Sequence, residues 1–225
     1  DKGGHETDEA AYFLSANRGK KSVTVDITKT KGQNIIRKLA AECDILIENY
    51  KVGGLKKYGL DYDSLSRINP RLVYCSITGF GQTGPYSPRA GYDFLIQAMG
   101  GLMSVTGEAE SRPGGGPQKI GVALSDILTG LYTTIGALSA LAMREKTGRG
   151  QHVDMALLDV TIASMANQAM NYLATGEAPG RTGNYHPNLT PYQVFDCSDG
   201  YIIIATGNDP QYQRLCRLLG LDDLH

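Results

Sequence analysis

Short apolar runs alternate with segments of helical periodicity in the first part of the chain. Runs that are apolar throughout or at every second position predict strands at Ser22–Ile27, Asp44–Glu48 and Leu72–Thr78. Apolar residues at helical spacing predict the intervening helices at Gly32–Glu42, Gly54–Tyr58 and Tyr62–Ile68. Strands that alternate with helices in this way favour an α/β fold with a parallel sheet.

The middle of the chain has longer helical stretches, and the pattern changes again towards its end. Helices are expected at Tyr92–Val105, Asp126–Glu145 and Leu157–Leu173, with a strand at His152–Ala156. Tyr192–Phe195 and Tyr201–Ala205 flank the turn Ser198–Gly200 and predict a hairpin, which a helix at Pro210–Leu219 follows. This change predicts a large α/β domain over residues 1–180 and the beginning of a smaller α+β domain over residues 181–225.

Composition narrows the classes of partner. The 225 residues carry a formal net charge of -1, with 20% charged residues, which argues against a nucleic-acid groove or an anionic membrane surface as the main partner. The four cysteines form no C-x-x-C pair, so a disulfide framework or a zinc site is not expected and a reduced cytoplasm is favoured. The histidines show no metal-ligand spacing either, at His5, His152, His186 and His225.

Asp126 is the only charged residue between Gly121 and Met143. Its apolar neighbours predict a helix face that enters a core: Val122, Leu124, Ile127, Leu128 and Leu131. Burying an ionised carboxylate without a partner costs roughly several kcal/mol, so Asp126 is expected to have a specific role. One interpretation is a nucleophile made reactive by partial desolvation. The other is a helix cap formed together with Ser125.

The rest of this apolar stretch, Ile127–Met143, is too short and too rich in Thr, Ser and Gly for a membrane span, so a buried helix is expected. Asp93, which follows Tyr92 before another apolar helix, is a second carboxylate of interest. Its simpler interpretation is again a helix cap.

Gly79–Gly84 fits G-x-G-x-x-G directly after a predicted strand, as in dinucleotide-binding folds. A dinucleotide site needs a helix that begins there, whereas Pro85 and Pro88 predict a loop. The alternative is a flexible loop that lets the backbone approach a ligand closely. Cations lie in or beside the predicted loops and helix ends, at Arg18, Lys20, Lys21, Lys51, Lys56, Lys57 and Arg89. Most fit a solvated surface, and a few could meet the phosphates of an anionic cofactor.

Motifs spread over nearly the whole chain point to one family. They are Asn17–Ser22, Ile47–Tyr50, Ser76–Pro85, Arg89–Asp93, Val122–Asp126 and Lys146–Gln151. Together they resemble the class III coenzyme A-transferases, which include the formyl-CoA, carnitine-CoA and succinyl-CoA–hydroxymethylglutarate transferases. Pro191–Phe195 with Asp199–Tyr201 is most similar to the branch that uses dicarboxylates.

The resemblance implies a Rossmann-like domain, an interlocked homodimer, and CoA transfer between an acyl-CoA and a carboxylic acid without a permanently bound cofactor. Asp126 matches the family's nucleophile, which implies an aspartyl–acyl anhydride followed by an aspartyl-CoA thioester. Leu124 and Ile127 would help to exclude water, which would hydrolyse the anhydride. Backbone N–H groups near Gly79–Gly84 would stabilise the oxyanion.

For CoA, the resemblance implies contacts at Val25, Thr28, Asn49, Tyr50 and Lys57, and a pocket at Tyr92 with Arg89 nearby. Two departures from the family pattern stand out. The polar opening segment leaves out the family's first strand–helix segment, and Pro187–Thr190 replaces a glycine-rich lid. The second departure argues against formyl-CoA or oxalate as substrate. Arg89 is the best-placed cation for the distal carboxylate of a dicarboxylate, with His186 and Asn188 as secondary candidates.

Two alternatives remain at this point. An α-methylacyl-CoA racemase has the same fold, but Tyr92 occupies the position of its histidine, and an unperturbed pKa of about 10 makes tyrosine a poor base at neutral pH. A non-catalytic acyl-CoA-binding subunit is the second alternative, against which an intact Asp126 speaks.

Overall fold

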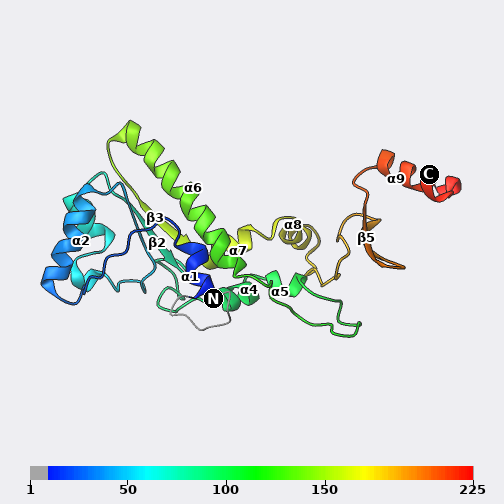
Figure 1. The fold of residues 1–225 in the computed structure, drawn as a ribbon, viewed down its shortest axis with the longest axis horizontal. Coiled ribbons are helices and arrows are strands. Elements are labelled where there is room, and N and C mark those ends of the chain that lie inside the picture. The colour runs from blue at the N-terminus through cyan, green and yellow to red at the C-terminus, as the bar shows by residue number, and fades with distance from the viewer. Residues whose placement is uncertain (1–9, 225) are drawn as a thin grey trace, which may run out of the picture.

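A three-stranded parallel sheet organises the larger part of the molecule (Figure 1). The computed structural model describes residues 10–224. Its strands β1 (Ile45–Glu48), β2 (Val73–Thr78) and β3 (His152–Ala156) lie in that order. Ile45 pairs with Val73, and Tyr74 pairs with His152. The expected α/β fold with a parallel sheet is therefore confirmed.

Helices connect and cover these strands. The first part of the chain forms α1 (Ala11–Ala16), α2 (Thr30–Glu42), the 3-10 turn η1 (Lys56–Tyr58) and α3 (Tyr62–Ile68). The middle forms α4 (Asp93–Met99), α5 (Leu102–Val105), α6 (Leu124–Thr147), α7 (Leu157–Ala163) and α8 (Ala166–Thr175). The last part forms the antiparallel hairpin β4 (Tyr192–Cys197) and β5 (Gly200–Ala205), then α9 (Asp209–Leu219) and the turn η2 (Asp222–Leu224).

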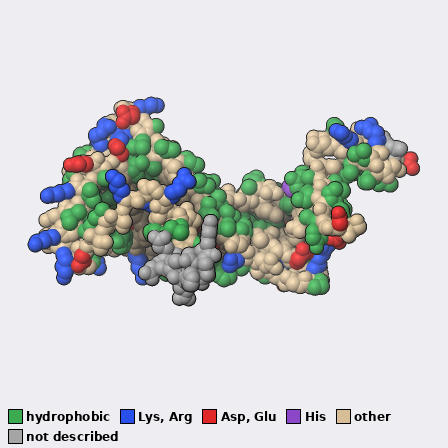
Figure 2. Space-filling model, viewed as in Figure 1, with side chains coloured by type: hydrophobic (Ala, Val, Ile, Leu, Met, Phe, Trp, Pro, Cys, Tyr) green, Lys and Arg blue, Asp and Glu red, His purple; other side chains and the backbone are tan. Residues whose placement is uncertain are grey.

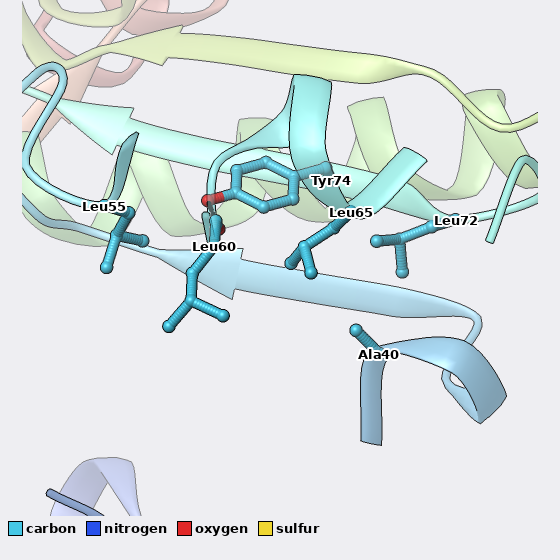
Figure 3. Packing of buried hydrophobic residues seen from close by; sticks show 6 residues of the cluster. All are labelled: Ala40, Leu55, Leu60, Leu65, Leu72 and Tyr74. Carbon is cyan, nitrogen blue, oxygen red and sulfur yellow. Dashed lines mark hydrogen bonds between the residues drawn. The ribbon is translucent and has the colours of Figure 1, made fainter. Parts of the chain in front are cut away.

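One face of the sheet packs against α2, α3 and the loop between them. Six buried residues form this cluster, as Figure 3 shows: Ala40, Leu55, Leu60, Leu65, Leu72 and Tyr74. The Tyr74 hydroxyl donates to the Leu60 carbonyl at 3.0 Å, and burial raises the pKa of this phenol. The cluster fixes the strand ends against the loop that follows β1.

The opposite face of the sheet packs against α6 through small side chains. Ala137 and Ala140 contact Val73 and Cys75, while the buried hydroxyl of Thr133 donates to the Thr129 carbonyl at 2.7 Å. A hydroxyl that bonds within its own helix can face the sheet without an unsatisfied donor.

The larger apolar side chains of α6 point away from the sheet, with Ile127, Leu131, Ile135 and Leu138 each at least half exposed. The expected core face around Asp126 and the expected buried helix are therefore wrong. Figure 2 shows hydrophobic side chains along this side of α6. By length and composition alone, α6 is the one helix in residues 10–224 that could cross a membrane, a test that core helices also pass.

Four expected elements differ from the structure. The helix expected at Gly54–Tyr58 forms only the 3-10 turn η1. Ser22–Ile27 is not a strand, because no described strand lies beside it to share hydrogen bonds. The expected helix Tyr92–Val105 breaks into α4 and α5 at Gly101, which has a φ of 87°. The expected helix Leu157–Leu173 likewise breaks into α7 and α8 before Ala166, whose φ is 45°.

The hairpin and the last helix are confirmed. The Asn208 side chain caps α9 by accepting from the Gln211 amide at 3.1 Å, and Pro210 lies in its first turn. Figure 1 shows β5 and α9 at the end of the molecule away from the sheet. The division at residues 180 and 181 stays a prediction.

Candidate active site

A cavity of about 590 Å³ opens where β1 and β2 end and α6 begins. Ligands of open α/β sheets bind outside the carboxyl ends of the strands, and the cavity lies at that edge. Five residues expected from the sequence line it: Asn49, Tyr50, Arg89, Tyr92 and Asp126. The residues that follow β1, the end of β2 and the first turns of α6 therefore meet in one place.

Asp126 is the third residue of α6, and its side chain is exposed at the cavity. Partial burial of the carboxyl group raises its pKa above the ordinary aspartate value of 3.8, and the Asp93 carboxylate raises it further. A carboxylate that is costly to ionise is a stronger nucleophile once ionised. The interpretation of Asp126 as a helix cap is wrong, since the capping position is Ala123.

Asp93 is a cap, but not of its own helix. The N-cap of α4 is Tyr92, and Asp93 is the first residue of that helix. Its Oδ1 instead accepts from the Ser125 amide at 2.8 Å and from the Asp126 amide at 3.4 Å, both at the beginning of α6. The two carboxylates of interest are therefore neighbours, and one holds the backbone of the other.

Two glycines allow this approach. Gly79 follows β2, Gly91 precedes Tyr92, and their backbones lie in direct contact. A Cβ placed on Gly79 would lie 2.5 Å from the Gly91 Cα, a distance that real Cβ atoms essentially never show. Because neither residue has a side chain, the loop that carries Tyr92 and Asp93 can lie against the end of β2.

Arg89 and Tyr92 give the cavity a cationic and an aromatic wall. The Arg89 guanidinium carbon lies 4.3 Å from the centre of the Tyr86 ring, so the ring supports the cation. No carboxylate within residues 10–224 forms an ion pair with Arg89. Tyr92 is 76% exposed. Both side chains are available to a ligand.

Three expected CoA contacts do not line this cavity. Val25 and Thr28 lie in the segment before α2, where Thr28 donates to the Asp26 carboxylate through its amide and its hydroxyl. The Lys57 ammonium lies 4.8 Å from the centre of the Tyr58 ring, on an exposed turn. These assignments stay predictions.

The glycine-rich loop 79–84 begins no helix, which agrees with the loop expected from Pro85 and Pro88. Two of its amides are already bonded, since Gly81 donates to the Thr78 hydroxyl and Gln82 to the Asp154 carboxylate, both at 2.9 Å. The N–H groups of Gly81 and Gln82 thus bind the protein itself, and oxyanion donors near Gly79–Gly84 stay a prediction.

Within the described range 10–224, no group of three or more His, Cys, Asp or Glu side chains could hold a metal ion. His152 pairs with the Ser76 hydroxyl at 2.9 Å, and the His186 ring accepts from the Asn188 amide at 3.0 Å. His186 and Asn188 do not line the cavity, and His5 and His225 lie outside the described residues.

The sequence interpretation missed Gln97, which is fully buried and bonded to Asp93. Its spacing of four residues from Asp93 on one helix was the available signal, because such residues are neighbours on a helix surface. It also missed Thr129 and Gly130, which line the cavity one turn after Asp126.

Comparisons with known proteins agree with this arrangement. The chain is 53% identical over 212 residues to the succinate–glutarate CoA-transferase of Agrobacterium fabrum, which covers 94% of the chain and 52% of that protein. It is 44% identical over 216 residues to the human succinyl-CoA:glutarate CoA-transferase, covering 96% of the chain and 48% of that protein. The chain therefore spans about half the length of these relatives.

A crystal structure of a CAIB/BAIF family protein from Brucella suis superimposes with a TM-score of 0.83 at 60% identity, over 96% of this chain and 56% of that one. The model of CoA-transferase family III matches residues 2–225. A match over nearly the whole chain, together with relatives named for the same chemistry, decides the assignment. The chain belongs to CoA-transferase family III.

Proposed function

We propose that this protein transfers coenzyme A from an acyl-CoA to a dicarboxylic acid, with Asp126 as the nucleophile. The observation that carries the proposal is the position of Asp126, whose carboxylate is exposed in a cavity lined by Asn49, Tyr50, Arg89 and Tyr92. The relatives named above act on succinate and glutarate or their CoA thioesters, which supports the substrate class.

The reaction proceeds by acyl exchange at three carbonyl carbons, those of the donor, of Asp126 and of the acceptor. An Asp126 carboxylate oxygen attacks the thioester carbon, the C–S bond breaks, and CoA leaves as the thiolate while an aspartyl–acyl anhydride forms. The thiolate then attacks the Asp126 carbonyl carbon and releases the donor acid as its carboxylate. The acceptor carboxylate attacks the aspartyl carbonyl carbon of this thioester, which expels CoA as the thiolate and forms an aspartyl–acceptor anhydride. The thiolate then attacks the acceptor's carbonyl carbon, which forms the acceptor's CoA thioester and releases Asp126 as its carboxylate. No step consumes water, so the thioester energy is retained.

The cavity fits an anionic, extended ligand. Its volume of about 590 Å³ lies within the ordinary range for cofactor sites, roughly 300–1,000 Å³. Lys51 and Arg89 line it and could meet phosphate or carboxylate groups. Lys57, Val25 and Thr28 lie outside it, so their contact with CoA would have to involve a part of the ligand that extends beyond the cavity.

We further propose that two copies associate as an interlocked homodimer. The exposed apolar side of α6 supports this, because large contiguous apolar patches mark protein contacts more often than solvent-facing surface. A reducing, cytoplasmic location is part of the same proposal, since Cys43, Cys75, Cys197 and Cys216 are all free thiols.

Mass spectrometry of the protein after incubation with succinyl-CoA tests the nucleophile. A covalent adduct on the peptide that contains Asp126 is expected, with loss of the adduct and of transfer in Asp126→Asn and Asp126→Ala, because neither an amide nor a methyl group attacks the thioester. Full transfer by the alanine variant would show that Asp126 is not the nucleophile.

A second measurement separates transfer from racemisation. Incubation with a 2-methylacyl-CoA in heavy water should give no deuterium at the α-carbon, because Tyr92 is a poor base. Rapid exchange that requires Asp126 would favour a racemase. Binding of acyl-CoA without an adduct or transfer would instead favour a non-catalytic subunit.

A further inference from the structure

Helix α6 begins without a cap of its own. Its capping residue, Ala123, has no side-chain acceptor, although the first amides of any helix lack partners within the helix. The Ser125 and Asp126 amides are satisfied from outside, by Oδ1 of Asp93 on α4 at 2.8 and 3.4 Å. The backbone that carries Asp126 is thus held by a residue more than 30 positions earlier in the chain.

Asp93 is itself held in place. Its Oδ2 accepts from the Gln97 side-chain amide at 2.7 Å, one turn further along α4. Gln97 is fully buried, and its Oε1 accepts from the Ile120 amide at 2.9 Å. The Gln97 Nε2 also donates to the Val122 carbonyl at 3.4 Å. Gln97 therefore ties the segment that leads into α6 to the helix that caps α6.

A third contact fixes the other side of this helix start. The Thr161 hydroxyl of α7 donates to the Ser125 hydroxyl at 2.8 Å, and both side chains are buried. The residue before Asp126 is therefore held by α4 through its amide and by α7 through its side chain. The Asp126 side chain remains directed at the cavity, whose wall it forms.

We propose that Asp93 and Gln97 are positioning residues, which aim the Asp126 carboxylate into the cavity and use the charge of Asp93 to favour its acylation. The inference rests on the proposed role of Asp126 as nucleophile. Asp93 also lines the cavity, and the proposed role acts through the backbone and the charge of Asp126.

The charge effect follows from the two carboxylates being close. The Asp93 charge destabilises ionised Asp126 and raises its pKa, second in size to the effect of burial. Acylation makes Asp126 neutral, so the repulsion disappears in the anhydride and in the thioester. The charge of Asp93 therefore raises the free energy of the free enzyme with ionised Asp126, but not that of the covalent intermediates. Other charged or titratable groups that line the same cavity are Glu48, Tyr50, Lys51, Arg89 and Tyr92.

Two substitutions separate position from charge. Asp93→Asn keeps an oxygen that can accept the α6 amides but removes the charge, whereas Asp93→Ala removes both. Gln97→Leu removes the support for Asp93 and leaves its charge. Asp159→Asn is the matched control, because Asp159 is an exposed aspartate in the first turn of the neighbouring helix α7.

Three readouts follow the variants: hydrogen exchange of the Ser125 and Asp126 amides, the pKa of Asp126 by carboxyl-carbon NMR, and single-turnover formation of the Asp126 adduct with succinyl-CoA. Asp93→Asn should keep the amides protected, lower the pKa of Asp126 and shift the adduct equilibrium towards free enzyme. Asp93→Ala should lose amide protection and slow adduct formation on the order of 10²-fold, the effect of a small misplacement of a reacting group. Gln97→Leu should weaken protection and slow the adduct, and Asp159→Asn should change none of the three.

Protected amides and an adduct rate within about twofold of wild type in Asp93→Ala would overturn the positioning role. An unchanged pKa of Asp126 and an unchanged adduct equilibrium in Asp93→Asn would overturn the charge role. If Asp93→Ala does not fold, Asp93→Asn and Gln97→Leu carry the test through the same readouts. If the Asp93 variants show the expected amide and pKa changes but the wild type forms no adduct, the cap is supported and the proposed nucleophile is contradicted.

Discussion

At the scale of single residues, the chain keeps a carboxylate where its ionised form is unfavourable. Burial and the neighbouring Asp93 both raise the pKa of Asp126, so the folded protein holds the Asp126 proton more tightly than the unfolded chain does. Ionised Asp126 therefore lowers the free energy of unfolding. This loss of stability is absent at pH values below the ordinary aspartate value of 3.8 and is complete once the pH has risen through the higher folded-state pKa. Reactive groups are commonly kept at such a cost to stability.

Asp126→Asn should therefore raise the thermal midpoint at neutral pH, because the amide has no charge to desolvate. The gain should shrink as the pH falls and vanish near pH 3, roughly, where aspartate is protonated in both states. Thermal unfolding across this range checks the prediction, with the exposed Asp159→Asn as control. A gain that is equal at all pH values would show that the charge is not its cause.

Arg89 is the residue to which we assign the distal carboxylate of a dicarboxylate substrate. Arg89→Met should raise the KM for succinate much more than for a monocarboxylate of equal length, because an unpaired buried charge costs ~2–5 kcal/mol. Steady-state kinetics with the two acids checks this. Weaker affinity for every acyl-CoA would make Arg89 a CoA contact, and unchanged kinetics would make it a surface residue.

At the scale of elements, α6 is fixed at both ends by residues outside it. Asp93 holds its beginning, and near its end the Arg144 guanidinium donates to the Asp44 carboxylate at 2.8 Å and to the Arg71 carbonyl at 3.0 Å. Arg144 is buried, whereas its partner Asp44 is exposed to solvent. The helix is thereby set along the sheet, and the place where Asp126 meets the cavity is set with it.

Arg144→Met should lower the free energy of unfolding by ~1–3 kcal/mol, because it removes the charged donor of two hydrogen bonds. Lys146→Met, two residues further on the exposed surface of the same helix, should change it by less than about 0.5 kcal/mol. Chemical denaturation of both variants makes the comparison. Equal effects would mean that net charge, not the bonds of Arg144, is responsible.

Elements with a local signal were predictable, and elements that depend on distant partners were not. The strands Asp44–Glu48 and His152–Ala156 carry short buried patterns and form within a residue of their expected bounds. Ser22–Ile27 carries a strand pattern but lacks a described neighbour to pair with. The Asp93 cap joins residues far apart in sequence, so no local pattern could indicate it.

The orientation of α6 shows the same limit. The periodicity of a helix indicates that the side chains on its two sides differ in hydrophobicity and size. It does not indicate which side packs against the protein's own sheet. Here the small residues Ala137 and Ala140 do, and the bulky ones face outward. Asp126 itself was identified by resemblance, because its pattern alone favoured a helix cap.

At the scale of the whole molecule, the exposed apolar side of α6 indicates a surface that contacts another protein. Ile127, Leu131, Ile135 and Leu138 form one stripe at helical spacing, 50–60% exposed. In the proposed homodimer a second copy would bury this stripe. The catalytic residue would then lie on a helix that also carries the subunit contact.

Leu138→Asp should shift the protein from dimer to monomer in sedimentation equilibrium, because it places a charge in an apolar contact. Leu39→Asp is the matched control, because Leu39 is an exposed leucine on α2, which covers the opposite face of the sheet. A monomeric wild type, or a dimer that survives Leu138→Asp, would contradict the proposed contact.

The contact between Gly79 and Gly91 requires that both positions lack a side chain. Each backbone occupies the space that the other's methyl group would need, so a change at one position cannot be rescued by any residue at the other. In a library with both codons randomised and selected for CoA transfer, glycine should return at both positions together. The site thus depends on the absence of Cβ atoms at these two glycines as well as on its two carboxylates.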